Sequence, residues 1–450
     1  MLIVALPAVL WGLTPHGNMT DSSLPALGVM VIAGIRFSAV VFARTRRLYE
    51  LTFWIFTFIF MGMAPFVQSR LDERPGTTPW FRFDLIPHAW AVVYVGLVAF
   101  LAGSLLGSRG GSRAKAPRPI SVARTTVVAL AGTGSAAYFI VTLGLSSFFT
   151  DRYELAEIGG RTGTDPVVGA LFSGLARMGL LIGCLLIVAR LRTTHRRSLG
   201  LWAFAVLPFA ALFVLVNPLT SPRFLVGITY LAILVATGLL RQMRAYRTVF
   251  IGLLVGMVTV FPFLNLFRLA SGQAAAGGAL EAMTTGDYDA FVQIVNAIDY
   301  VGAHGSTQGM QMMGVLLFFV PRGVWPAKPY DSGILLAQFQ HYRFENLSAP
   351  LWSELYLNAG MVGVATGFFL LGLALRRVDA RVDRQITLTG MPSLINCVLP
   401  FYFLMLLRGS LLQAASQVAA LALCVMLASA APRSRQRAGA GSPHNPTLEA

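Results

Sequence analysis

Residues 348–360 read Ser-Ala-Pro-Leu-Trp-Ser-Glu-Leu-Tyr-Leu-Asn-Ala-Gly, and they end the longest polar segment of the chain. That segment, residues 268–353, lies between apolar windows at 248–267 and 354–375. Each window matches the roughly 20 residues that a helix needs to cross a bilayer. Residues 348–360 therefore mark a point where the chain re-enters a membrane.

Ten further apolar windows surround this point, and composition supports the same class. Only 12% of the 450 residues are charged, about half the usual share of a soluble protein, and 56% are hydrophobic. The other windows lie near residues 2–13, 24–43, 51–67, 88–107, 124–144, 167–189, 199–216, 223–240, 390–407 and 411–431. We predict an all-α polytopic membrane protein with about 12 transmembrane helices, or 11 if the first short run does not span.

The predicted organisation has four parts. Residues 1–267 carry transmembrane helices 1–9, and residues 268–353 form one large loop with short helices and the predicted active site. Residues 354–431 carry helices 10–12. Residues 432–450 are rich in Gly, Pro, Arg and Ser, which predicts a disordered cytoplasmic tail.

The distribution of charge predicts the orientation. One alternating set of loops holds 22 basic residues, whereas the other holds 11 basic and 15 acidic residues. By the positive-inside rule the first set is cytoplasmic, so both termini are inside and residues 268–353 are external. The net charge of +16 is thereby explained by topology and contact with membrane lipid, and we expect no nucleic-acid partner.

The large loop has its own predicted structure. An apolar stripe favours a helix from Leu280 to Tyr300, and the 12-residue apolar run 309–320 suits an interfacial or re-entrant helix. Prolines at 321, 326 and 329 are expected to hold the following residues in an extended path.

Four cations are candidates for binding a diphosphate at the external surface. They are Arg223, Arg268, Arg322 and Lys328, which could surround one pocket. A guanidinium donates two parallel charge-assisted hydrogen bonds to such a group. The alternative is that each side chain only extends to the bilayer interface.

Two residues are candidate general bases. Glu354 stands where the chain re-enters the membrane and shares a helix face with Asn358. It either accepts a proton from a hydroxyl or compensates the helix dipole. His341 is the second candidate.

Other charged residues leave two interpretations open. Asp287 and Asp289 suit either an Asp-x-Asp metal pair or helix capping, and we predict no metal and no cofactor. Arg36 and Arg177 fall within spans, where they line a water path or contact carbonyls.

The three cysteines lie in apolar runs and do not have the spacing of metal ligands.

Three motifs of the loop resemble the O-antigen (oligosaccharide repeat-unit) polymerase family of bacterial surface polysaccharide pathways. They are Gly-Asp-Tyr-Asp at 286–289, Phe-Phe-Val-Pro-Arg-x-x-Trp-Pro-x-Lys-Pro at 318–329, and Ser-x-Pro-x-x-x-Glu-x-Tyr-x-Asn-x-Gly-x-x-Gly at 348–363. The Arg-x10-Gly spacing associated with that family occurs at Arg152 with Gly163 and at Arg322 with Gly333.

The resemblance implies metal-independent, inverting transfer of a growing glycan from undecaprenyl diphosphate to a lipid-linked repeat unit. The reaction would take place on the outer face of the bacterial cytoplasmic membrane, with a flippase and a chain-length regulator as partners. Arg322 and Glu354, or His341, would be catalytic. Arg152, Tyr356 and Asn358 would join Arg223, Arg268, Arg322 and Lys328 in binding substrate.

Two other functions stay open at this stage. An O-antigen ligase shares the layout but is expected to carry a histidine near the second re-entry, where this chain has Glu354. A multi-pass transporter or flippase of lipid-linked oligosaccharide suits twelve spans with both ends inside. In a transporter, however, the longest loop is expected to be cytoplasmic and central rather than external and late.

Overall fold

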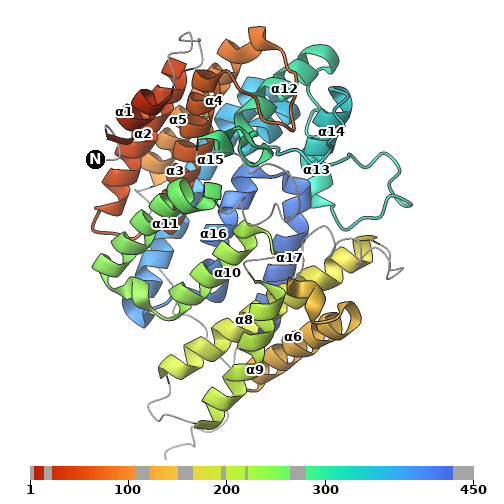
Figure 1. Ribbon diagram of the computed structural model, residues 1–450. Helices are drawn as coiled ribbons and strands as arrows, with labels where there is room; N and C mark the ends of the chain where they lie inside the picture. Colours follow the sequence, from red (N-terminus) through yellow and green to blue (C-terminus); the bar gives the residue numbers. More distant parts are fainter. Residues whose placement is uncertain are drawn as a thin grey trace, which may run out of the picture.

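A computed structural model describes residues 5–14, 23–107, 122–149, 166–193, 199–217, 221–263 and 280–428. All regular structure in these ranges is helical, and they contain no strand (Figure 1). The predicted all-α class is therefore confirmed for the described part of the chain. Arg152, Gly163, Arg268 and the predicted tail lie outside it.

Every predicted apolar window coincides with a helix. The elements that cover them are α1 (Ala5–Leu13), α2 (Ser23–Val41), α3 (Leu48–Phe56), η1 (Thr57–Met63), α4 (Ala64–Leu71), α5 (Ile86–Gly107), α6 (Val122–Leu143), α8 (Pro166–Thr193), α9 (Leu199–Leu215), α10 (Arg223–Ala236), η4 (Leu239–Arg241), α11 (Met243–Phe263), α15 (Leu351–Thr389), α16 (Leu394–Arg408) and α17 (Leu411–Ala428). Short 3-10 turns η2 (Phe83–Leu85) and η3 (Ser146–Phe149) precede α5 and follow α6. Among the described residues, seven helices are long and apolar enough to cross a membrane.

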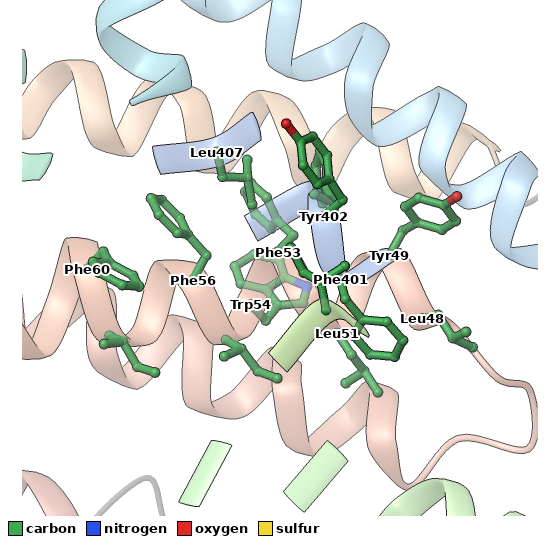
Figure 2. Packing of buried hydrophobic residues seen from close by; sticks show 14 of the residues in the cluster. Leu48, Tyr49, Leu51, Phe53, Trp54, Phe56, Phe60, Phe401, Tyr402 and Leu407 are labelled. Atoms are coloured by element: carbon green, nitrogen blue, oxygen red, sulfur yellow. The ribbon is translucent and has the colours of Figure 1, made fainter. Parts of the chain in front are cut away.

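The most buried span of the described part is the continuous helical segment formed by α3, η1 and α4. All residues of α3 and η1 are buried, because apolar residues lie on every face of both helices, and their one charged residue, Glu50, is paired with arginines. Figure 2 shows Phe53, Trp54 and Phe56 of this segment beside Phe401 and Tyr402 of α16. A helix without a polar face is typical of the interior of a membrane bundle.

A proline explains the π-helical turn in this segment. Pro65 has no backbone N–H, so the Met61 carbonyl, four residues earlier, lacks its ordinary helical partner. Just before the proline, the Ala64 N–H donates to the Ile59 carbonyl, five residues back. The wider turn carries Gly62 against Met30 of α2, where an added Cβ would lie 2.6 Å from Met30 Cγ.

Glycines bring α5 and α15 into backbone contact. A Cβ added at Gly103 would lie 2.0 Å from the Phe369 carbonyl oxygen, and one at Gly372 would lie 2.2 Å from that of Phe100. Small residues at such crossings are typical of helix packing in membranes. Any larger residue at either position would separate the two helices.

Helix α15 contains a break that was not predicted. Ala359 and Gly360 leave helical geometry, and Gly360 has a φ of +58°, which favours glycine. The freed carbonyl of Leu357 accepts hydrogen bonds from Thr307 N (2.7 Å) and Oγ1 (3.1 Å), and that of Asn358 accepts one from Gly309 N (3.2 Å). Residues 351–358 are thus fixed to the large loop rather than continuous with the span.

The large loop folds into short helices, as predicted, but with different bounds. They are η5 (Glu281–Thr284), η6 (Gly286–Tyr288), α12 (Ala290–His304), α13 (Met310–Leu316) and α14 (Ser332–Phe339). The prediction of one helix from Leu280 was wrong, because the carbonyls of Gly286 and Asp287 bind the Arg408 side chain instead of the next helical turn. Helix α13 is shorter than predicted, although it leaves Met310, Met313 and Leu316 exposed.

The extended path predicted for the proline-rich segment was also wrong. Val324 N and Trp325 N both donate to the Pro321 carbonyl, and Lys328 N donates to that of Trp325, so the segment consists of tight turns. These turns follow α13 in a projection at the edge of the molecule (Figure 1). Proline fixes its own φ but is equally compatible with turns.

Hydrogen bonds gather the basic loops at one end of the bundle. Arg46 binds Asp383 and the carbonyl of Leu240, and Arg47 N donates to Tyr246 Oη. Residues from three loops that the charge bias assigned to one side are therefore in contact. Arg36 pairs with Glu50 at 2.7 Å, which differs from both interpretations left open for it, and Arg177 lies partly buried in α8.

The loops assigned to the other side also meet one another. Gln68 donates to the carbonyls of Met283 (2.8 Å) and Tyr288 (3.0 Å), and Trp80 donates to that of Gln340 (3.0 Å). The hydrogen bonds named here therefore join loops that the charge bias assigned to the same side.

Single-cysteine labelling checks which set of loops faces outward. Gly323→Cys lies where an added side chain has open space, and Leu388→Cys replaces a 69% exposed residue at the end of α15. In intact cells a membrane-impermeant maleimide is expected to label the first variant and not the second. Cys184, Cys397 and Cys424 are buried, so wild type serves as the blank. Labelling of position 388 alone would reverse the assigned orientation.

Candidate functional site

Arg408, the last residue of α16, organises the first motif of the loop. Its Nε donates to the Asp287 carbonyl (3.0 Å), and its Nη2 donates to the Gly286 carbonyl (3.0 Å). Nη2 also lies 3.7 Å from Asp289 Oδ1. The cation is thus placed at the negative end of its own helix, which stabilises it, while it binds 286–289.

Asp289 is a buried carboxylate with several partners. Its Oδ2 accepts hydrogen bonds from Ser348 N (3.2 Å) and Gln293 Nε2 (3.4 Å). Burial raises the pKa of this carboxyl, and the nearby Arg408 charge opposes the rise. Asp289 therefore joins the first motif to the beginning of the third at Ser348.

Asp287 pairs with a different arginine. Arg223 at the start of α10 donates from Nη2 to Asp287 Oδ2 (2.9 Å) and from Nη1 to the Phe261 carbonyl (2.6 Å). The Arg223 side chain is 6% exposed, whereas that of Asp287 is 33% exposed. This predicted diphosphate ligand is thus a largely buried cation with a carboxylate beside it.

Both carboxylates of the Asp-x-Asp motif are paired with arginines, Asp287 with Arg223 and Asp289 with Arg408. Asp289 stands at the N-cap of α12, but its side chain accepts no hydrogen bond from a backbone N–H of the first turn, so the capping interpretation was wrong for this residue. Across the residues that the structure describes, no group of three His, Cys, Asp or Glu side chains is arranged to hold a metal ion.

Glu354 joins three helices. Its side chain is buried in the first turn of α15; Oε1 accepts from Leu411 N (2.9 Å), the first amide of α17, and Oε2 accepts from Ser332 Oγ (2.8 Å) of α14. The carboxylate therefore compensates the N-terminal dipoles of two helices. Both carboxylate oxygens of Glu354 already accept hydrogen bonds from the protein. A group that takes a proton from a substrate at this place would therefore be a second, neighbouring group that is in contact with solvent.

Asp331 is such a group, and the sequence interpretation did not include it. It precedes Ser332, is only partly buried, and caps α14 by accepting a hydrogen bond from Gly333 N (2.9 Å). Burial raises the pKa of its carboxyl. Gly333 is required here, because an added Cβ would lie 2.4 Å from the Leu347 carbonyl oxygen.

Asn358 and Tyr356 leave the same helix in different directions. Asn358 Oδ1 accepts from Met312 N (3.0 Å), so it caps α13 from a distant part of the chain, and its Nδ2 donates to the Glu354 carbonyl (2.7 Å). Tyr356 Oη lies 3.1 Å from His88 Nε2 at the start of α5. Asn358 positions the loop, whereas Tyr356 contacts the bundle.

Arg322 and Lys328 hold the projecting turns together. Arg322 donates to the carbonyls of Lys328 (2.6 Å) and Pro329 (3.0 Å), and Lys328 Nζ donates to those of Phe318 (2.6 Å) and Val320 (2.9 Å). Burial, followed by the Arg322 charge, lowers the pKa of Lys328. These cations belong to a different hydrogen-bond network from that of Arg223.

His341 lies at the far end of α14 from Glu354. It follows the helix with a φ of +56° and is exposed. Ser332, which contacts Glu354, is the first residue of α14, and eight helical residues span about 12 Å. The two candidate bases are therefore not neighbours.

These contacts define one group, here called the junction cluster because it surrounds the short connection between α16 and α17. It consists of Gly286–Asp289, Arg223, Asp331, Ser332, Ser348, Glu354 and Arg408–Leu411. Arg408 is the principal residue that sequence reasoning missed. Its signal was an arginine followed by Gly-Ser between two apolar runs, which also suits a simple interfacial anchor.

A double-mutant cycle tests the Arg408–Asp289 pair. Arg408→Ala leaves Asp289 buried without its cation, and such losses cost roughly 3–5 kcal/mol, less here because Arg408 is partly exposed. We expect a clear fall in the thermal unfolding temperature in detergent and partial recovery in Arg408→Ala/Asp289→Asn. The matched control is Arg82→Ala, which removes an exposed pair with Asp84 and a longer contact (3.5 Å) with Asp299, and it should change little. Additive losses for Arg408→Ala and Asp289→Asn would contradict the coupling.

Comparison of the chain with family models, curated proteins and solved structures gives no match. The candidate site therefore rests on the junction cluster and on the resemblance of the three loop motifs.

Proposed function

We propose that this chain is a polysaccharide repeat-unit polymerase of the bacterial cytoplasmic membrane, with both termini cytoplasmic and the junction cluster on the outer face. One observation carries the proposal. Two of the three loop motifs that support the resemblance, at 286–289 and 348–363, meet at the same helix junction together with two arginines and two buried carboxylates. Separate surface anchors would not need this convergence.

The reaction is a single displacement at the anomeric carbon of the donor glycan. A hydroxyl of the lipid-linked acceptor attacks, the bond between that carbon and the undecaprenyl diphosphate oxygen breaks, and a carboxylate takes the hydroxyl proton. Arg223 and Arg408 supply fixed positive charge near the departing diphosphate. Arg322 and Lys328 on the projecting turns would contact the diphosphate from the membrane side.

Asp331 and Glu354 have different roles in the proposed base catalysis. Glu354 is buried and accepts hydrogen bonds from Ser332 and Leu411, whereas the nearby Asp331 is partly exposed to solvent. We assign the proton to Asp331 and a positioning role to Glu354, which fixes α14 and hence Asp331. His341 remains the alternative base.

Extension of lipid-linked oligosaccharide in proteoliposomes tests the proposed function. We expect purified wild type to convert undecaprenyl-diphosphate repeat units into a ladder of longer products. Arg223→Gln and Arg322→Ala should each lower the rate about 10²-fold or more, because each removes a donor to developing charge. Arg343→Ala, an exposed arginine of the same loop, is the matched control and should behave as wild type.

Other products would identify the rival functions. Movement of the oligosaccharide across the bilayer without elongation would indicate a transporter. Transfer only to a lipid A acceptor would indicate a ligase. Either result would contradict the polymerase proposal.

The pH dependence of extension tests the base. Because burial raises the pKa of Asp331, its proton-accepting form is lost on acidification at a higher pH than for a free aspartate, whose pKa is about 3.9. On acidification, the extension rate should therefore fall with a midpoint at a pH above the pKa of a free aspartate. Asp331→Asn should lower the rate about 10²–10⁴-fold and abolish this fall, here called the acid limb.

Two further variants are the controls for that profile. Glu354→Gln should lower activity but keep the acid limb, since it acts on position, and His341→Ala should keep both. A limb that persists in Asp331→Asn and disappears in His341→Ala would transfer the role of base to His341.

A further inference from the structure

A cleft of about 440 Å³ lies between α3, the second half of α15 and the first half of α16, whereas Arg408 of the junction cluster lies at the last residue of α16. Its apolar walls are Leu375 and Val378 on α15 and Ile395 and Leu399 on α16. Its volume falls within the roughly 300–1,000 Å³ of typical ligand sites. Val378, Ile395 and Leu399 are only partly buried, so the walls are accessible from outside the bundle.

The cleft follows from the way α15 and α16 form a hairpin. Leu375, Val378 and Arg381 are three residues apart, so they lie along one face of α15. Gly390 ends α15 with a φ of +82°, which turns the chain back into α16. Tyr49 of α3 lines the cleft together with both helices, and Figure 2 shows Tyr49 beside the segment of α16 that carries Phe401.

The neutral polar groups of the cleft are bonded to one another or to the connection between the helices. Tyr49 Oη donates to Asn396 Oδ1 (2.7 Å), and Asn396 Nδ2 donates to Ser393 Oγ (2.9 Å). Gln385 Oε1 accepts from Ser393 N (3.0 Å). The lining is therefore apolar in character, with Arg381 as its charged residue.

The carboxylates of α15 beside the cleft serve contacts within the protein. Asp379 is buried and accepts hydrogen bonds from Tyr49 N and Glu50 N (3.0 Å each), and Asp383 pairs with Arg46 at 2.9 Å. Two arginines of the same helix, Arg377 and Arg381, are exposed at the surface, and Arg381 also lines the cleft.

The position of the cleft relative to the bilayer points to a lipid. The part of α15 after its break, residues 361–389, is about 44 Å long, whereas the hydrocarbon core is about 30 Å thick. Its apolar part ends at Leu375, and the basic residues follow directly. In a bilayer we therefore expect Leu375 at the depth of the acyl chains and Arg381 at the depth of the phosphates.

We propose that this cleft binds an anionic phospholipid of the bilayer, with one acyl chain against the α15–α16 walls and the phosphate at Arg381. Charge complementarity and depth both select this occupant over a zwitterionic lipid. The bound lipid fills the space between the hairpin and α3. It therefore stabilises the contact of Asp379 with the start of α3. The proposal is independent of the glycan chemistry.

Lipid binding to the delipidated protein in detergent tests this site by native mass spectrometry and by thermal unfolding. We expect phosphatidylglycerol to bind at least tenfold more tightly than phosphatidylcholine with the same chains, and to raise the unfolding temperature more. Arg381→Gln should reduce this preference to within about twofold. Arg377→Gln, on the same helix but outside the lining, is the matched control and should keep it. Leu399→Trp should fill the cleft and weaken both lipids.

Three outcomes would overturn the proposal. They are equal binding of the two lipids by wild type, a preference that survives Arg381→Gln, and equal losses in Arg377→Gln and Arg381→Gln. The last would mean that diffuse surface charge, rather than this cleft, holds the lipid. Arg381 is exposed, so its variant is expected to fold, and retained binding of phosphatidylcholine would demonstrate that it does.

Discussion

The structure depends on buried charge at the connection between α16 and α17. Arg408 ends one helix and binds 286–289, while the first amide of the next helix binds Glu354. A buried carboxylate is costly without its partners, so the loop must return to these positions for Asp289 and Glu354 to be satisfied. The same contacts that stabilise the loop gather its reactive groups.

At both ends of the bundle, buried carboxylates and arginines fix loops to helices, but the surfaces that result differ. At the end rich in basic residues, Arg46 and the carboxylates of α15 fix the α2–α3 connection to the bundle, which leaves a cleft beside exposed arginines. At the other end, arginine and carboxylate lie around a partly open carboxyl, Asp331. We propose that one end holds membrane lipid and that the other acts on a charged, lipid-linked substrate.

Sequence predicted the helices well and the cluster only in part. Apolar windows locate the helices because bilayer-length burial is a local property of the sequence. Arg322 and Lys328 were placed on an extended segment because their binding to carbonyls of their own turns has no signature in residue type. Arg408 was missed because its partners are more than 100 residues away, and Asp331 because a single aspartate before a short helix usually indicates only a cap.

Photo-crosslinking with an undecaprenyl-diphosphate oligosaccharide that carries a photoreactive group beside the diphosphate tests the central claim most directly. If the junction cluster binds the reacting end of the substrate, labelled peptides will contain residues 286–289 and 408–411, and unlabelled substrate will compete. Labelling confined to the projecting turns at 318–330, or labelling that unlabelled substrate does not displace, would contradict the account.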